Sequence, residues 1–89
     1  MVEQTIIISN KLGLHARASA KLVARANRYS SEIFIKRNNQ TVNGKSILGV
    51  MMLAATQNTE IVLIIDGDDE NQALEDLISL ISDRFGETE

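Results

Sequence analysis

Several residue types are scarce or missing in this chain of 89 residues. Cysteine is absent, which excludes disulfides, thiolate chemistry and metal sites with cysteine ligands. Histidine occurs once, which argues against a structural zinc site, so we expect no bound metal. Aromatic residues make up 3% of the chain and the formal net charge is −3. A basic face with stacking rings is therefore missing, and we expect no nucleic-acid partner.

Long hydrophobic runs are also absent. The chain has neither a secretory signal pattern nor an apolar run of membrane-spanning length, so we expect a cytoplasmic protein without membrane insertion. Its length and its 44% apolar content suit one domain, residues 1–89, with a single core. Such a small chain cannot enclose a deep, two-sided active site. This favours an accessory protein over a complete enzyme with its own substrate pocket.

Hydrophobic periodicity predicts seven elements in the order βαββαβα. The predicted strands are residues 2–9, 32–37, 40–43 and 60–65, and the predicted helices are 16–27, 47–53 and 70–85. The economical arrangement is an α+β fold with three helices on one face of a small antiparallel sheet, the other face being open to water. We also expect a capping box from Asp69 and Gln72, Gly86 as the C′ residue of the last helix, and fraying of residues 87–89.

The single histidine, His15, stands at the joint between the first strand and the first helix. Gly13 supplies the freedom for a sharp turn there. The first backbone N–H groups of a helix have no internal partner, and with the helix dipole they form an anion site. Arg17 adds a planar, permanently charged donor fork suited to phosphate. A lone histidine is usually an ordinary surface or satisfied polar residue, but this setting indicates one that accepts a phosphoryl group.

Other polar residues have simpler explanations. The remaining basic residues of the first helix are each interpreted as solvated surface charges: Lys21, Arg25 and Arg28. Ser46 suits the N-cap of the short second helix, and capping alone explains a serine there. The acidic run 66–70 lacks the spacing of a calcium-binding loop, so we interpret it as a solvated turn with a helix cap. No second catalytic side chain can be placed beside His15 from the sequence.

The short helix after Ser46 is apolar all round. Either the whole segment belongs to the core, or one face is exposed as a docking patch, formed by Ile47, Leu48 and Met51. Methionine has a soft, adaptable side chain that suits a surface meeting several partners. The spacing alone favours neither alternative.

Two stretches resemble a known family. Residues 13–19, GLHARAS, resemble the active-site signature of HPr, the histidine-containing phosphocarrier family of the bacterial sugar phosphotransferase system. Residues 42–51, VNGKSILGVM, resemble its regulatory serine segment. Length and element order fit as well, so the similarity covers the whole chain. The resemblance implies an HPr-like open-faced β-sandwich, with three helices over a four-stranded antiparallel sheet.

The resemblance also implies a phosphoryl relay. His15 takes a phosphoryl group from enzyme I, itself charged by phosphoenolpyruvate, and passes it to the IIA component of a sugar transporter. Arg17 matches the family's arginine, and Ser46 matches the serine that HPr kinase/phosphorylase phosphorylates. Such a protein is a phosphohistidine intermediate instead of a self-sufficient enzyme, and it requires no cofactor. Most members carry proline where this chain has Ala18, which is expected to give the helix start slightly more freedom.

The resemblance and physical reasoning together add expectations about the partners and the site. The N–H groups of Ala16 and Arg17 are expected to hold the phosphoryl oxygens. Donor and acceptor proteins are expected to dock on a monomer through one surface, formed by Ala20, Ile47, Leu48, Gly49 and Met51. Two alternatives remain open. One is a regulatory paralogue of the nitrogen-related phosphotransferase branch, and the other is a small α+β binding module in which His15 is incidental.

Overall fold

Four strands form one antiparallel sheet in the order β1-β4-β2-β3. The computed structural model describes residues 1–89. Its strands are β1 (Val2–Ile7), β2 (Glu32–Arg37), β3 (Gln40–Asn43) and β4 (Glu60–Asp66). The predicted bounds of β2 and β3 are confirmed, whereas β1 ends two residues earlier than expected. Asn38, with a φ of 54°, lies in the tight turn between β2 and β3.

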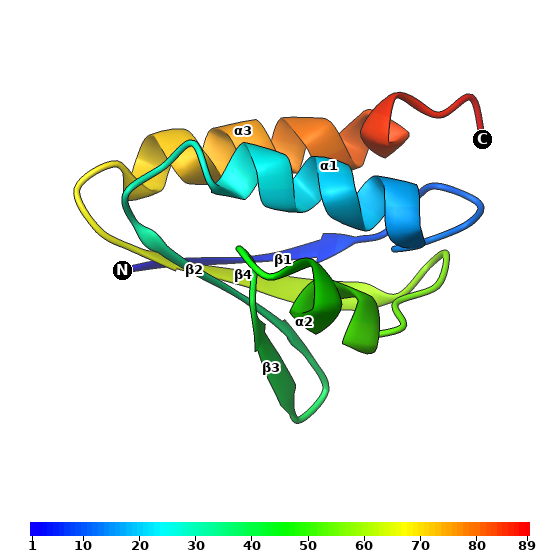
Figure 1. The fold of residues 1–89 in the computed structure, drawn as a ribbon, viewed down its shortest axis with the longest axis horizontal. Coiled ribbons are helices and arrows are strands. Elements are labelled where there is room, and N and C mark those ends of the chain that lie inside the picture. The colour runs from blue at the N-terminus through cyan, green and yellow to red at the C-terminus, as the bar shows by residue number, and fades with distance from the viewer.

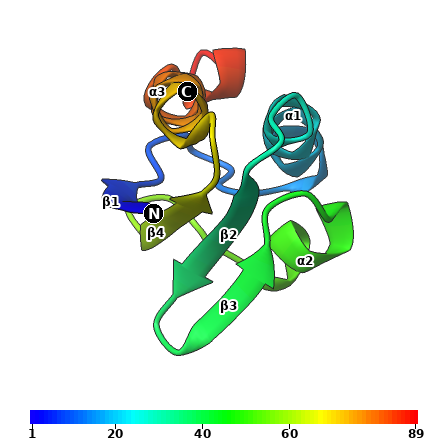
Figure 2. The same ribbon diagram turned by 90° about the vertical axis from the view of Figure 1, so that its left-hand side faces the viewer.

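Three helices lie on one face of the sheet: α1 (Ala16–Ala26), α2 (Ile47–Met52) and α3 (Glu70–Ser82) (Figures 1 and 2). The long helices α1 and α3 lie side by side, and α2 sits beside α1 near the β3 edge. This arrangement confirms the predicted α+β fold with three helices on a four-stranded antiparallel sheet. No helix has the length and apolar character needed to cross a membrane.

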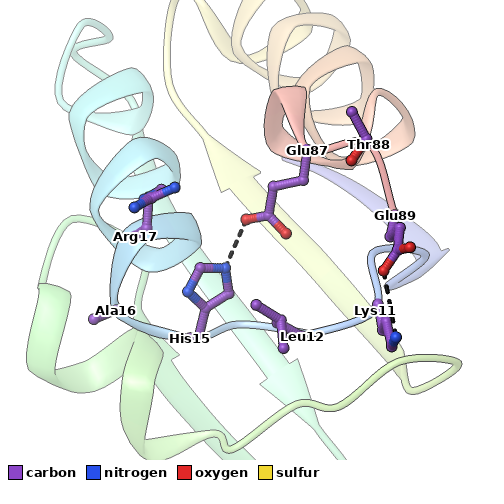
Figure 3. Close-up of a pocket in the computed structure, with 8 residues that line it drawn as sticks. All are labelled: Lys11, Leu12, His15, Ala16, Arg17, Glu87, Thr88 and Glu89. Carbon is purple, nitrogen blue, oxygen red and sulfur yellow. Dashed lines mark hydrogen bonds and ion pairs between the residues drawn. The ribbon is translucent and has the colours of Figure 1, made fainter.

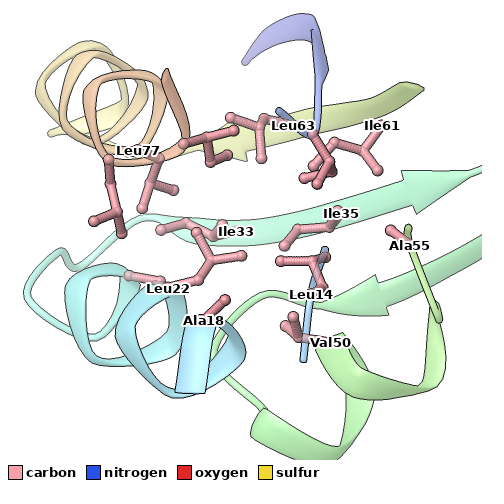
Figure 4. Close-up of a cluster of buried hydrophobic side chains, with 14 of the residues drawn as sticks. Leu14, Ala18, Leu22, Ile33, Ile35, Val50, Ala55, Ile61, Leu63 and Leu77 are labelled. Atoms are coloured by element: carbon pink, nitrogen blue, oxygen red, sulfur yellow. The ribbon is translucent and has the colours of Figure 1, made fainter. Parts of the chain in front are cut away.

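The core lies between the sheet and the helices (Figure 4). Alternate residues of β2 and β4 point inward and are buried, because side chains alternate between the two faces of a strand. These inward residues are Ile33, Ile35, Ile61, Leu63 and Ile65. Leu22 of α1 and Leu77 of α3 pack against them from the helical layer. Burial of these aliphatic chains fixes the two long helices over the sheet.

The last helix ends earlier than predicted. It stops at Ser82 instead of residue 85, and a single 3-10 turn, Arg84–Gly86, follows it. Arg84 and Phe85 both adopt left-handed conformations, with φ of 57° and 56°. This turn redirects the backbone while Phe85 stays buried in the core, which is why the hydrophobic pattern continued past the helix end. Gly86 is consequently not the C′ residue of α3, although its φ of 78° is one that glycine favours.

The predicted capping box at the start of α3 does not form. The Asp69 carboxylate instead accepts hydrogen bonds from the backbone N–H groups of Ser30 and Ser31, at 2.9 and 3.0 Å, and from the Ser31 hydroxyl. The hydrogen bond from the Ser31 hydroxyl, followed by that from the Ser30 backbone, lowers the pKa of Asp69 to about 2. Asp69 thus ties the turn before α3 to the segment that enters β2.

Candidate functional site

A tight loop presents His15 between β1 and α1, as predicted. Gly13 has a φ of 65°, and a Cβ atom there would lie 2.4 Å from the carbonyl oxygen of Ala55. The next residue, Leu14, donates its N–H to the same carbonyl at 2.8 Å. Glycine is therefore required at position 13 both by backbone conformation and by this close approach. The loop is anchored to the chain that follows α2.

His15 is the N-cap residue of α1. It has an extended backbone, with φ −73° and ψ 178°, and its carbonyl oxygen accepts the Ser19 N–H at 2.8 Å. The first N–H groups of the helix, those of Ala16, Arg17 and Ala18, make no hydrogen bond within the protein. The expected free N–H donors at the helix start therefore lie beside the imidazole, and their role as an anion site stays a prediction.

The imidazole and Arg17 border the same hollow, of about 580 Å³ (Figure 3). The His15 side chain is 28% exposed, so a reacting group can approach the ring. Arg17 is exposed and pairs with no carboxylate, which leaves its guanidinium available for an anion. His15, Ala16 and Arg17 thus border one hollow, and their role in binding a phosphoryl group stays a prediction.

A carboxylate that sequence reasoning missed contacts the imidazole. Oε2 of Glu87 lies 2.6 Å from Nε2 of His15, and Oε1 accepts a hydrogen bond from Nδ2 of the buried Asn10 at 3.1 Å (Figure 3). Asn10 also donates to the carbonyl oxygen of Gly13, at 2.8 Å. Asn10 therefore links the histidine loop to the segment that carries Glu87.

The expectation that residues 87–89 fray is wrong. The carbonyl oxygen of Glu89 accepts the Lys11 N–H at 2.9 Å, and that of Thr88 accepts a hydrogen bond from Arg84 at 3.3 Å. Nζ of Lys11 also lies 3.3 Å from the Glu89 carboxylate. These contacts pin the segment across the histidine loop. The sequence offered no periodic signal for them, because each joins groups outside any repeating element.

The Glu87 carboxyl is largely buried, with 16% of its side chain exposed. Burial acts to raise its pKa, but the hydrogen bonds with His15 and Asn10 outweigh burial and leave the pKa below its usual value. The nearby charge of Lys21 acts in the same direction. Glu87 is therefore a carboxylate at neutral pH, directed at one nitrogen of the histidine ring.

Two basic residues of α1 are not the solvated charges that we expected. Nζ of Lys21 donates to the carbonyl oxygen of Phe85 at 2.6 Å, and Arg25 forms a salt bridge with Asp76 of α3. The helical pattern could not show these contacts, because both partners come from the region of α3 and the turn after it. Both contacts hold α1 against that region of the chain.

Exposure excludes the alternative in which the whole apolar second helix belongs to the core, while docking on its exposed face stays a prediction. Ile47, Leu48 and Met51 are exposed, Leu48 to 71%, while Val50 on the opposite side is buried. Ala20 of the neighbouring α1 is exposed too, and Gly49 is half-buried. Sequence reasoning missed two further exposed apolar side chains nearby, Met52 and Leu12, and Leu12 borders the hollow at His15.

Ser46 caps α2 as expected. Its Oγ accepts a hydrogen bond from the Gly49 N–H at 3.2 Å, and its backbone carbonyl accepts that of Val50 at 3.0 Å. The side chain is half-buried. The hydroxyl therefore stands at the positive end of the short helix and next to the exposed apolar residues.

Comparison with known proteins identifies the family. The family model described as "PTS HPr component phosphorylation site" matches residues 2–83. The phosphocarrier protein HPr of Neisseria meningitidis serogroup A is 52% identical over 89 residues, which is 100% of both chains. The chain belongs to the HPr family. Membership fits the geometry above, in which an accessible histidine stands at a free helix start.

Solved structures of HPr proteins share the fold. The crystal structure of HPr-C-His from Thermoanaerobacter tengcongensis superposes with a TM-score of 0.97 at 45% identity, and the match covers 100% of both chains. A second structure from that organism, described as an HPr dimer, has a TM-score of 0.79 at 46% identity and covers 98% of this chain and 100% of that one. The chain is thus an HPr phosphocarrier of the phosphotransferase system family, with an open-faced α+β sandwich.

Proposed function

We propose that His15 accepts a phosphoryl group from phospho-enzyme I and passes it to IIA components of sugar transporters. The observation that carries this proposal is the partly exposed imidazole beside the three free N–H groups that open α1. An anion held there lies next to the ring, so donor, nucleophile and charge-stabilising groups meet at one point. The protein then acts as a phosphohistidine intermediate that depends on other proteins for both half-reactions.

The attacking atom in this proposal is Nδ1 of His15. Nε2 faces the Glu87 carboxylate, which accepts hydrogen bonds but cannot donate them, so Nε2 holds the proton of the neutral ring. The lone pair is then on Nδ1, the ring nitrogen on the side of Ala16 and Arg17 in Figure 3. In-line attack by Nδ1 on phosphorus forms a phosphoramidate that remains easy to transfer.

Charge stabilisation in this scheme comes from Arg17 and the backbone. The N–H groups of Ala16 and Arg17 donate to the phosphoryl oxygens, and the unpaired guanidinium of Arg17 supplies a planar, charged fork. Their hold on the phosphoryl group must stay modest, because a carrier that binds its cargo too tightly cannot release it. No metal ion or organic cofactor takes part.

The proposed docking surface for enzyme I and IIA components lies beside the site. It consists of Ala20, Ile47, Leu48, Gly49 and Met51. Support comes from the exposure of three large apolar side chains on α2, a helix that packs beside α1. Apolar side chains gathered on one exposed face are typical of a protein interaction site.

Ser46 is proposed as a site of regulatory phosphorylation by an HPr kinase/phosphorylase. Its hydroxyl already caps α2, so a phosphate there meets the favourable end of the helix dipole and the fold tolerates it. The new charge lies beside the docking surface, where a partner must desolvate it or oppose it with its own charges. Regulation would then act on docking and leave the chemistry at His15 unchanged.

Residues 1–89 are proposed to act as one cytoplasmic phosphocarrier domain and as a monomer. The alternative is a regulatory paralogue of the nitrogen-related branch, which would use the same histidine chemistry and deliver the phosphoryl group to regulators. Incubation with phosphoenolpyruvate and enzyme I tests the proposal. One phosphate that is labile to acid and stable to base is expected, and its absence would contradict the proposal.

A further inference from the structure

Glu87 is held in one place by contacts on both sides of its backbone. Before it, the carbonyl oxygen of Phe85 accepts a hydrogen bond from Lys21 at 2.6 Å, and the Phe85 side chain is buried. After it, the carbonyl oxygen of Glu89 accepts the Lys11 N–H at 2.9 Å. The hydrogen bond from buried Asn10 then orients the carboxylate itself. A side chain fixed at so many points is suited to orient another group.

The other charges around the ring are already engaged or lie elsewhere. Lys11 is paired with Glu89 at 3.3 Å, and Lys21 is bonded to a carbonyl oxygen. Arg17 stands at the helix start, where the phosphoryl oxygens are proposed to bind. Glu87 is therefore the one carboxylate that contacts the imidazole directly, and it does so at the nitrogen away from the proposed reaction.

We propose that Glu87 is a positioning residue for phosphoryl transfer, which keeps the proton on Nε2 of His15 and balances the positive charge of the phosphorylated ring. The inference rests on the proposed function, in which His15 is the acceptor. It assigns a specific task to a side chain 72 residues away in the chain.

The proposed task follows from the electron balance of transfer. The Nδ1 lone pair forms the bond to phosphorus, while the bond between phosphorus and the donor breaks and its electron pair goes to the donor. The ring then carries a positive charge, since the proton stays on Nε2. The Glu87 carboxylate, 2.6 Å from that atom, offsets the charge. In onward transfer the Nδ1–P electron pair returns to the ring, and again no proton has to leave.

The position of the proton is measured first, in unphosphorylated protein by ¹⁵N NMR of the imidazole with the ring neutral. The wild type and Glu87→Gln are expected to show Nε2–H, because a glutamine carbonyl oxygen can still accept that proton. Their Nε2–H signal is expected to persist against exchange with water. In Glu87→Ala that protection is lost and the population with the proton on Nδ1 rises several-fold.

Transfer is measured next, as kcat/KM for phosphorylation by phospho-enzyme I. Glu87→Gln keeps the hydrogen bond but loses the charge, and we expect its rate to fall about tenfold. For Glu87→Ala, kcat/KM is expected to fall at least as far. Glu87→Asp retains the charge, so its kcat/KM is expected to lie between that of Glu87→Ala and that of the wild type. The matched control is Glu89→Gln, which removes a carboxylate from the same segment without touching the ring. It should stay within about twofold of the wild type.

The outcomes separate this inference from the proposed function. Suppose that the wild type is phosphorylated and that kcat/KM for Glu87→Gln and Glu87→Ala lies within twofold of the wild-type value. That result would overturn the positioning role. An unchanged, protected Nε2–H in Glu87→Ala would show that Glu87 does not keep the proton on Nε2. A wild type that takes no phosphate from enzyme I overturns the proposed function, and the positioning role falls with it.

Discussion

Nε2 of His15 lies 2.6 Å from Oε2 of Glu87, although 72 residues separate them in the chain. The contact joins the loop before α1 to the segment after α3, so the site combines two segments that are far apart in the sequence (Figure 3). Asn10 bonds to Gly13 and to Glu87 at once and couples the two parts. Substitutions of Glu87 are therefore expected to change the chemistry at His15 and not merely the stability of the chain.

The Arg17 guanidinium is expected to stabilise the transferring phosphoryl group. Arg17→Lys keeps the charge but loses the planar fork, so we expect kcat/KM with enzyme I to fall about tenfold. Arg17→Glu reverses the charge and should lower it by more than about 100-fold. Melting temperatures should change little, since Arg17 is exposed. Arg28→Glu, an exposed arginine in the turn just after α1, is the charge-matched control and should have a much smaller effect. Equal rates for wild type and Arg17→Glu would remove Arg17 from the mechanism.

The exposed face of α2 is expected to carry docking. Leu48→Asp should raise the Michaelis constant for enzyme I by about 10- to 100-fold, as expected for a central interface residue. Its melting temperature should change by less than about 4 °C, because Leu48 is exposed. Val50→Asp, a buried position of the same helix, should unfold the protein instead. If Leu48→Asp were as unstable as Val50→Asp, Leu48 would be a core residue that stabilises the fold and not a docking residue.

Charge at Ser46 is expected to slow docking without unfolding the chain. Ser46→Asp retains a capping oxygen and should melt close to the wild type, yet accept phosphate from enzyme I much more slowly. Ser46→Ala loses the cap and should be less stable by about 1 kcal/mol, with transfer near the wild-type rate. Transfer by Ser46→Asp at the wild-type rate, or no phosphoserine after treatment with an HPr kinase and ATP, would contradict the regulatory proposal.

Asp69 is expected to make the fold sensitive to acid. Its pKa is about 2 in the folded protein, below the ordinary value of 3.8, because Ser30 and Ser31 donate hydrogen bonds to the carboxylate. Its contribution is therefore complete above about pH 4 and is lost as the pH falls through about 2. Asp69→Asn should be less stable than the wild type at pH 7, with the difference shrinking toward pH 2 in urea titrations. A difference that does not depend on pH would contradict this account.

Much of the fold follows from local pattern in the sequence. The alternation of Ile33 and Ile35 in β2 and the spacing of Leu77 and Ile81 in α3 predict faces that the structure buries. The joint that carries His15 is also local, since Gly13 and the helix start lie within a few residues of it. These features were predictable because neighbouring residues determine them.

The missed features depend on contacts between distant segments. Phe85 keeps the helical hydrophobic spacing, yet it is buried through a left-handed turn that periodicity cannot distinguish from helix. Asp69 had a plausible local partner at the helix start and bonds to the segment before β2 instead. Glu87 gave no signal at all, because an acidic residue near a chain end is ordinary. Its contact with His15 emerges once α1 and α3 are packed side by side.

Locating the phosphoryl group tests the central claim most directly. The wild type and His15→Ala are incubated with phosphoenolpyruvate and enzyme I and compared by ³¹P and ¹⁵N NMR. The account predicts one phosphoryl group in the wild type, bonded to Nδ1 of His15, and none in a His15→Ala protein that folds normally. Stoichiometric phosphorylation of His15→Ala, or a wild-type phosphoryl group on any other atom, would contradict it.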